Sequence, residues 1–181
     1  MEALKDVLEN VNGWLKFAEA KNAVLVTTSG VALWAGARLL VSDEIGCYLQ
    51  AYLCFLIVFL GAALITGLLS FLPVLSYSII VPKPYAVDNE NLLYFGYLST
   101  LSKNELVKKF LDALDAPDTE QNAFHPMYAE QIIINSRVAL AKYALFERGV
   151  NLIILGALTP VVGGLLLYAA KNKRKATDGV G

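Results

Sequence analysis

The stretch CYLQAYLCFLIVFLGAALITGLLSFLPVLSYSIIV, residues 47–81, decides the fold, because it contains no charged side chain. About 20 apolar residues, rising ~1.5 Å each along a helix, cross a bilayer core of roughly 30 Å. Two further apolar stretches lie on either side of it in the chain, at residues 23–41 and 151–170. The first contains Arg38 as its one charged residue, and the second contains none. The sequence therefore predicts an integral membrane protein with three transmembrane helices.

The composition supports this prediction. Hydrophobic residues make up 56% of the 181 residues, and the mean hydropathy is +0.53. A chain this apolar cannot cover its surface with polar side chains, so lipid must act as the solvent for much of it. The net charge of -1 gives no reason to expect binding to a nucleic acid polymer.

The remaining sequence divides where its polarity changes. We predict, in chain order, an amphipathic N-terminal helix at 1–22, a transmembrane hairpin at 23–81, a polar domain at 82–150, a third transmembrane helix at 151–170 and a basic tail at 171–181. The predicted fold class is an all-α membrane protein. Its small, mainly helical domain lies between spans two and three.

The N-terminal helix and the second span each leave an alternative open. Apolar residues recur at three- and four-residue steps before the first span; they are Leu4, Val7, Leu8, Val11, Leu15 and Ala18. We expect this helix to continue into the first span, and a separate helix in the membrane plane is the alternative. One helix over 47–81 would be roughly 50 Å long. It therefore either projects from the membrane or breaks near Pro73, which lacks a backbone donor.

The polar domain contains one clear helix signal. The Ser102 hydroxyl can accept from the Glu105 amide while the Glu105 carboxylate reaches back, which is a capping box. The helix is predicted to run to about Leu114, with one apolar face made of Leu106, Phe110, Leu111 and Leu114. Residues 92–98 are aromatic and apolar, and they predict a strand or an extended segment. A helical pattern resumes at Met127 and continues into the third span without a stop signal.

Three spans place the N-terminal helix and the polar domain on the same side of the membrane. Basic residues near the spans on that side favour the cytoplasm; they are Lys5, Lys16, Lys21, Lys83, Arg137, Lys142 and Arg148. We therefore expect a multi-pass protein of the cell inner membrane with a cytoplasmic middle domain. The basic tail then lies outside, against the positive-inside rule, and a hairpin within 47–81 would instead give four spans.

Catalytic signatures are absent from the sequence. His125 is the only histidine, so one chain cannot form a histidine-based zinc cluster. No Gly-Xaa-Ser-Xaa-Gly, P-loop or Cys-Xaa-Xaa-Cys pattern occurs. We therefore expect a protein that is not an enzyme and that has no catalytic residue, metal site or cofactor.

The polar domain contains the three kinds of group that bind a small anionic nucleotide. These are aromatic faces for the base, amides for its edge and cations for its phosphate. The candidate ligand-binding residues are Asn91, Tyr94, Phe95, Gln131, Asn135, Arg137 and Lys142. Gln131 and Asn135 are four residues apart, so they share a helix face. The same residues also suit a domain that packs its aromatics and pairs its amides internally, so the residues alone leave both interpretations open.

Several short segments, taken in order and spacing, resemble one known family. They are AEAKN at 18–22, NLLYFG at 91–96, LSKNE at 101–105, QIIINS at 131–136, and Ala141, Lys142, Tyr143 and Phe146. They resemble the Pycsar transmembrane effector domain, from the pyrimidine cyclase system for antiphage resistance, over nearly the whole chain. The chain departs from the family pattern at Glu19, where aspartate is more usual, and at Asn22, where a small residue is.

The resemblance implies a membrane effector that binds a cyclic nucleotide, expected to be cyclic UMP or cyclic CMP, and then impairs membrane integrity to stop infected-cell growth. Its expected partners are this ligand, the lipid bilayer and further copies of the chain. Ala63 with Gly67 and Thr159 with Gly163 are small-residue pairs that would let helices approach closely. The alternative is a non-enzymatic membrane anchor or interaction protein that docks a protein partner through its middle domain.

Overall fold

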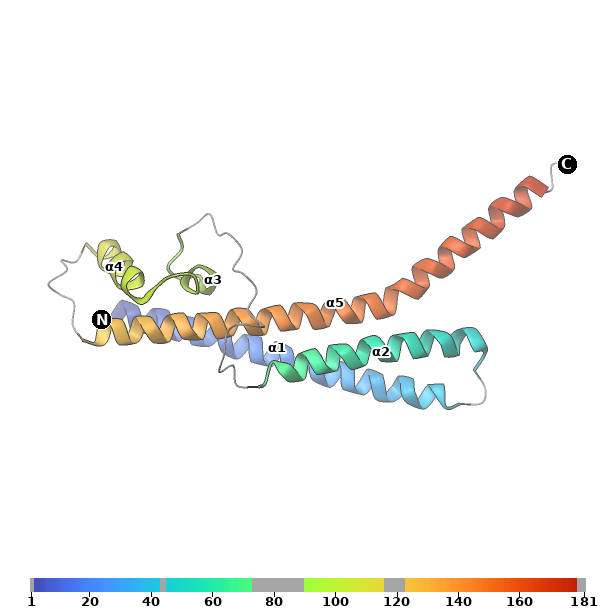
Figure 1. Ribbon diagram of the computed structural model, residues 1–181, viewed down its shortest axis with the longest axis horizontal. Helices are drawn as coiled ribbons and strands as arrows, with labels where there is room; N and C mark the ends of the chain where they lie inside the picture. Colours follow the sequence, from blue (N-terminus) through green and yellow to red (C-terminus); the bar gives the residue numbers. More distant parts are fainter. Residues whose placement is uncertain (1, 43–44, 73–89, 116–122, 179–181) are drawn as a thin grey trace. The chain divides into compact units, whose positions relative to one another are not determined.

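The computed structural model describes residues 2–42, 45–72, 90–115 and 123–178, and all regular secondary structure in these residues is helical (Figure 1). The helices, in chain order, are α1 Glu2–Leu40, α2 Cys47–Leu69, α3 Phe95–Leu98, α4 Lys103–Ala113 and α5 Phe124–Asp178. This confirms the predicted all-α fold class. Residues 73–89 and the last residues of the predicted basic tail, 179–181, lie outside the described residues.

The chain divides into two compact units. Unit 1 contains residues 1–23 and 68–146, and unit 2 contains residues 24–67 and 147–181. Helices α1 and α5 each begin in unit 1 and end in unit 2 without a break in the helix. The prediction that the N-terminal helix continues into the first apolar stretch is therefore confirmed, and the alternative of a separate in-plane helix is wrong.

Unit 1 has one hydrophobic core, to which α1, α3, α4 and α5 all contribute. Its buried side chains include Leu4, Val7 and Val11 of α1, Leu98 of α3, Leu106 and Phe110 of α4, and Ile132 and Leu140 of α5. The α1 residues recur at three- and four-residue steps, so they lie on one face of the helix. Each fully buried side chain of this size contributes about 1.5–3 kcal/mol. The apolar face of the N-terminal helix therefore forms one wall of the core of unit 1.

Helix α4 begins with the predicted capping box. The Ser102 backbone amide donates to a Glu105 carboxylate oxygen at 2.8 Å, and the Glu105 amide donates to the Ser102 hydroxyl at 3.4 Å. The Ser102 hydroxyl, and then its backbone amide, hold the pKa of the Glu105 carboxyl below its ordinary value. The stability from this cap is therefore present at neutral pH and is lost as the pH falls through the lowered pKa.

Two sequence predictions need correction in the described residues, and one open alternative is decided. Residues 95–98 form the short helix α3 rather than a strand or extended segment. The second apolar stretch does not form one helix to residue 81, because α2 ends at Leu69 and a turn follows, as the alternative of a break near Pro73 predicts. Leu114 is exposed at the end of α4 and does not join the buried face of that helix.

Unit 2 packs its helices closely at glycines. A Cβ atom on Gly67 of α2 would lie 2.7 Å from Cγ2 of Val26 on α1, and one on Gly156 of α5 would lie 2.7 Å from Cβ of Phe59 on α2. Neither helix pair could approach this closely with a larger residue at that position. Ala63 and Gly67 are therefore buried within unit 2, whereas Thr159 and Gly163 of the second small-residue pair are exposed.

Helix α5 contains Pro160 in its interior and changes direction along its last third (Figure 1). Proline supplies no backbone donor and its ring crowds the carbonyl four residues earlier, which is a common cause of helix bending.

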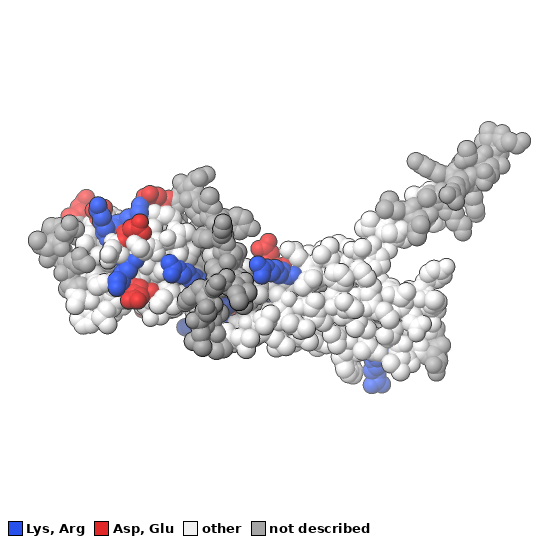
Figure 2. Space-filling model, viewed as in Figure 1, with Lys and Arg blue, Asp and Glu red and all other residues white. Residues whose placement is uncertain are grey.

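Three helices of the described residues are long and apolar enough to cross a membrane. They lie within Glu2–Leu40, Cys47–Leu69 and Phe124–Leu165. Charged side chains gather on the elements of unit 1, while the helices of unit 2 are mostly uncharged on the face shown (Figure 2). This distribution matches the prediction of apolar spans joined to one polar domain.

Candidate functional site

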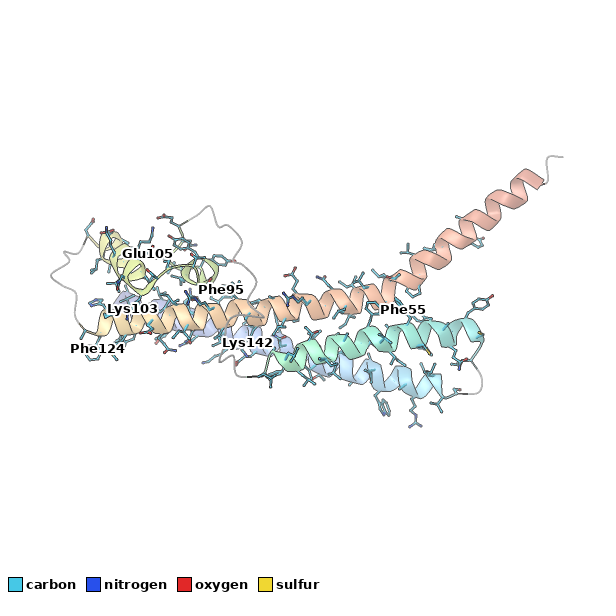
Figure 3. All side chains as sticks on the ribbon, in the orientation of Figure 1. Phe55, Phe95, Lys103, Glu105, Phe124 and Lys142 are labelled. Carbon is cyan, nitrogen blue, oxygen red and sulfur yellow. The ribbon has the colours of Figure 1, made fainter. Side chains whose placement is uncertain are left out.

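The two aromatic residues predicted to contact a base lie together in unit 1. The Phe95 ring is buried, and its centroid is 5.0 Å from that of Tyr94, 5.7 Å from that of Trp14 and 5.3 Å from that of Tyr143 (Figure 3). The Phe95 and Tyr143 rings are stacked at 18°. Phe95 therefore forms the floor of an aromatic cluster, and Tyr94 lies at its exposed edge.

Gly96 explains how Tyr94 reaches this position. A Cβ atom on Gly96 would lie 2.7 Å from Cζ and 2.9 Å from the hydroxyl oxygen of Tyr94. The Tyr94 ring therefore lies against the main chain, where only glycine leaves room for it. The glycine of the NLLYFG segment thus leaves room for the tyrosine ring in this position.

Asn91 takes part in local backbone structure. Its side-chain oxygen accepts from the Leu93 amide at 2.9 Å, in the manner of an Asx turn. Asn10 of α1 donates to the Leu93 carbonyl at 3.0 Å. These bonds hold the segment that leads into Tyr94 against α1.

The predicted amide pair is assembled on the surface of α5. Gln131 donates to the Asn135 side-chain oxygen at 2.9 Å, as their four-residue spacing predicts. Asn135 in turn donates to the side-chain oxygen of Asn12 on α1 at 2.8 Å. These bonds orient the two amides, and each uses one of the two N–H donors that the donating amide group carries.

Arg137 lies at a small cleft beside α4. Its Nε donates to the Ser99 carbonyl at 3.0 Å. The cleft has a volume of about 270 Å³ and also contains Lys103 and Glu130, whose charged atoms are 3.7 Å apart. Its volume is just below the range of about 300–1,000 Å³ that is usual for small-molecule pockets. Two cations and one carboxylate give the cleft a modest preference for an anion.

Lys142 is the most buried of the predicted site residues on α5, at 8% exposure. Its Nζ donates to the Ser70 carbonyl at 2.7 Å and lies 3.3 Å from a carboxylate oxygen of Glu19 (Figure 3). Asn22 donates to the Lys142 carbonyl at 3.0 Å. We call Glu19, Asn22, Ser70 and Lys142 the polar junction. It ties α1, the turn after α2 and α5 together within unit 1, close in sequence to where each segment passes into unit 2.

The structure therefore brings together two pairs of the predicted site residues. Tyr94 contacts Phe95, and Gln131 bonds to Asn135. The Tyr94 amide also donates to the Asn91 carbonyl at 3.1 Å. Within the described ranges, no other hydrogen bond, ion pair or ring contact joins these two pairs to each other or to Asn91, Arg137 or Lys142. The binding roles of these seven residues remain predictions.

Sequence reasoning missed three residues of this region. Trp14 and Tyr143 flank Phe95, and the Nζ of Lys21 lies 4.6 Å from the Phe17 ring centroid, 5.4 Å from that of Tyr143 and 5.3 Å from that of Phe146. The sequence of α1 does contain a pattern that could have indicated two of them, because Trp14, Phe17 and Lys21 recur at three- and four-residue steps. We call the following residues the aromatic strip: Trp14, Phe17, Lys21, Tyr94, Phe95, Tyr143 and Phe146.

Comparison with known proteins gives one match. The family model described as Pycsar effector protein domain matches residues 3–170, which span both units. Searches among curated proteins and among solved structures give no match. The three apolar helices and the family agree on an integral membrane protein. Because the match covers nearly the whole chain, the protein belongs to the Pycsar effector family, whose members act in antiphage defence.

Proposed function

We propose that this protein is a non-enzymatic effector of antiphage defence that binds a cyclic mononucleotide through unit 1 and then impairs membrane integrity, so that infected cells stop growing. The observation that carries the proposal is the family match over residues 3–170, which covers the polar unit and the apolar helices together. Cyclic UMP and cyclic CMP are the proposed ligands. The proposal needs no metal or cofactor.

Unit 1 offers the groups that such a ligand requires. Tyr94 keeps 38% of its surface exposed beside the buried Phe95 ring, so a face is open for base stacking. Cationic side chains lie on the same unit, and the amide pair on α5 is exposed to solvent at Gln131. These features support a nucleotide ligand in this unit.

Binding is tested by calorimetry on the purified full chain with cyclic UMP, cyclic CMP and the cyclic purine nucleotides. We expect one or both pyrimidine nucleotides to bind. Because stacking contributes about 1–3 kcal/mol per base, Tyr94→Ala should weaken binding by roughly ten-fold or more. Tyr48→Ala, at an exposed tyrosine of α2 in unit 2, is the matched control and should leave the affinity unchanged. If no nucleotide gave a binding signal, the result would instead favour a protein that docks a partner through unit 1.

We further propose that the protein lies in the inner membrane with unit 1 in the cytoplasm. Unit 1 combines the N-terminal residues with residues 68–146, which requires both segments to lie on one side of the membrane and supports three spans over four. Basic residues of both segments favour the cytoplasmic side. A reporter fused after residue 87 is expected to read cytoplasmic, and one fused after Gly181 is expected to read external. A reporter after residue 87 that reads external would contradict the proposed topology.

A further inference from the structure

We propose that the aromatic strip is the place where the nucleotide binds, with its base against Trp14 and Tyr94 and its phosphate at Lys21. This inference rests on the proposed function and adds to it a location and two residues, Trp14 and Lys21. All of the strip lies in unit 1, on α1, α3 and α5 and the residue before α3.

Contacts between neighbouring rings, and between the rings and Lys21, connect the residues of the strip. Phe95 is its buried floor, and the centroid of its ring is 5.7 Å from that of Trp14 and 5.0 Å from that of Tyr94. Tyr143 stacks on Phe95 and also contacts the Lys21 ammonium, so it joins the two ends of the strip. Trp14 is 39% exposed and Tyr94 is 38% exposed. Both side chains are therefore accessible to a planar base that stacks on an aromatic ring.

Lys21 provides the charge that a phosphate requires. Its ammonium lies among the rings of Phe17, Tyr143 and Phe146, and among the described residues it makes no ion pair. Aromatic rings stabilise an ammonium but leave its hydrogen-bond donors unused. A phosphodiester oxygen could accept these donors in a charge-assisted bond.

The spacing of the two ends fits one nucleotide. Trp14 and Lys21 are seven residues apart on α1, which is about 10.5 Å along the helix axis. Long side chains on a helix lean towards its N-terminus, and the Lys21 ammonium is accordingly close to the Phe17 ring at 4.6 Å.

An unused polar atom also lies in the strip. The Tyr143 hydroxyl is buried and has no hydrogen-bond partner among the described residues. An unsatisfied buried hydroxyl costs about 1–3 kcal/mol. A ligand oxygen or ring nitrogen that reached this hydroxyl would remove the cost, so binding would favour a rearranged packing of α1 against α5 within unit 1.

Tryptophan fluorescence gives a direct test, because Trp14 and Trp34 are the only tryptophans of the chain. In Trp34→Phe protein, Trp14 is the sole reporter, and we expect cyclic UMP or cyclic CMP to change its emission with the dissociation constant found by calorimetry. Lys21→Gln should raise that constant at least about ten-fold, as expected for a lost charge-assisted bond. The control Lys16→Gln, at an exposed lysine of α1, should leave it unchanged. Thermal unfolding verifies that each variant is folded.

The possible outcomes separate this inference from the proposed function. If calorimetry finds binding but neither the Trp14 emission nor Lys21→Gln responds, the site lies elsewhere and the inference is overturned while the proposed function stands. If no nucleotide binds the parent protein, both are overturned. A strip that serves the lipid headgroups would give a third pattern. Phosphatidylglycerol added to the detergent-solubilised protein would then change the Trp14 emission, while Lys21→Gln would leave nucleotide affinity unchanged, and this would also overturn the inference.

Discussion

A flexible Gly/Ser linker inserted between Arg148 and Asn151 is expected to abolish growth arrest while the purified protein still binds its nucleotide. Helix α5 runs from Phe124 to Asp178 without interruption and passes from unit 1 into unit 2. A continuous helix transmits a shift of one end to the other, whereas glycine and serine residues form a flexible coil that absorbs it. The measurements are calorimetry, culture growth after induction and membrane potential in cells.

A linker of the same length after Ser42 is the matched control. Ser42 lies in the turn that follows α1, so this insertion interrupts neither α1 nor α5. It should preserve growth arrest, and both insertions should change nucleotide affinity by less than about two-fold, or roughly 0.4 kcal/mol. If the α5 insertion still binds and still depolarises cells like the parent, the signal does not pass through α5. Helices α1 and α2, which are also continuous across the boundary between the units, would then be the next candidates.

Lys142→Met is expected to destabilise unit 1 strongly. Methionine resembles lysine in length, but it cannot donate to the Ser70 carbonyl or pair with Glu19, so the polar junction loses its central contacts. Loss of a buried partner costs about 1–3 kcal/mol, which corresponds to a fall of roughly 5 °C or more in Tm for a unit of this size. Thermal unfolding of the full chain in detergent measures the effect.

Glu19→Gln tests the ion pair between Glu19 and Lys142 separately from the hydrogen bond that Lys142 donates to the Ser70 carbonyl. The Glu19 side chain is 47% exposed, so removing its charge should cost less than about 1 kcal/mol of stability.

The prediction from sequence that Lys142 faces a phosphate leads to a different expected result for Lys142→Met. It implies that Lys142→Met loses nucleotide binding and keeps the parent Tm, and that outcome would rule out a structural role for the junction.

The long helices could be predicted because hydrophobicity and periodicity act locally. The uncharged 151–170 stretch and the three- and four-residue steps before residue 22 are each sufficient to indicate a helix. Helix α3 could not be predicted in this way. Its four residues are too few to show a helical period, and its conformation depends on burial of Phe95 and Tyr97 in a core that other helices provide.

The candidate site was predictable in its chemistry and less so in its grouping. Tyr94 and Phe95 were identified because aromatic residues in a polar domain are conspicuous. Trp14 and Lys21 were not identified, because nothing local in the sequence shows that the N-terminal residues pack with residues 68–146. The partners of Lys142 were unpredictable for the same reason, since Glu19 and Ser70 are distant from it along the chain.

The discontinuity of unit 1 has a consequence for engineering. Because residues 1–23 supply one wall of its core, a fragment of residues 68–146 alone would expose the apolar side chains that cover Leu4, Val7 and Val11. A chimera designed to exchange ligand preference between relatives must therefore carry both segments of unit 1, residues 1–23 and 68–146, from the same donor. A chimera that moves only the middle segment would join mismatched halves of one core, and we expect it to aggregate instead of acquiring the donor's specificity.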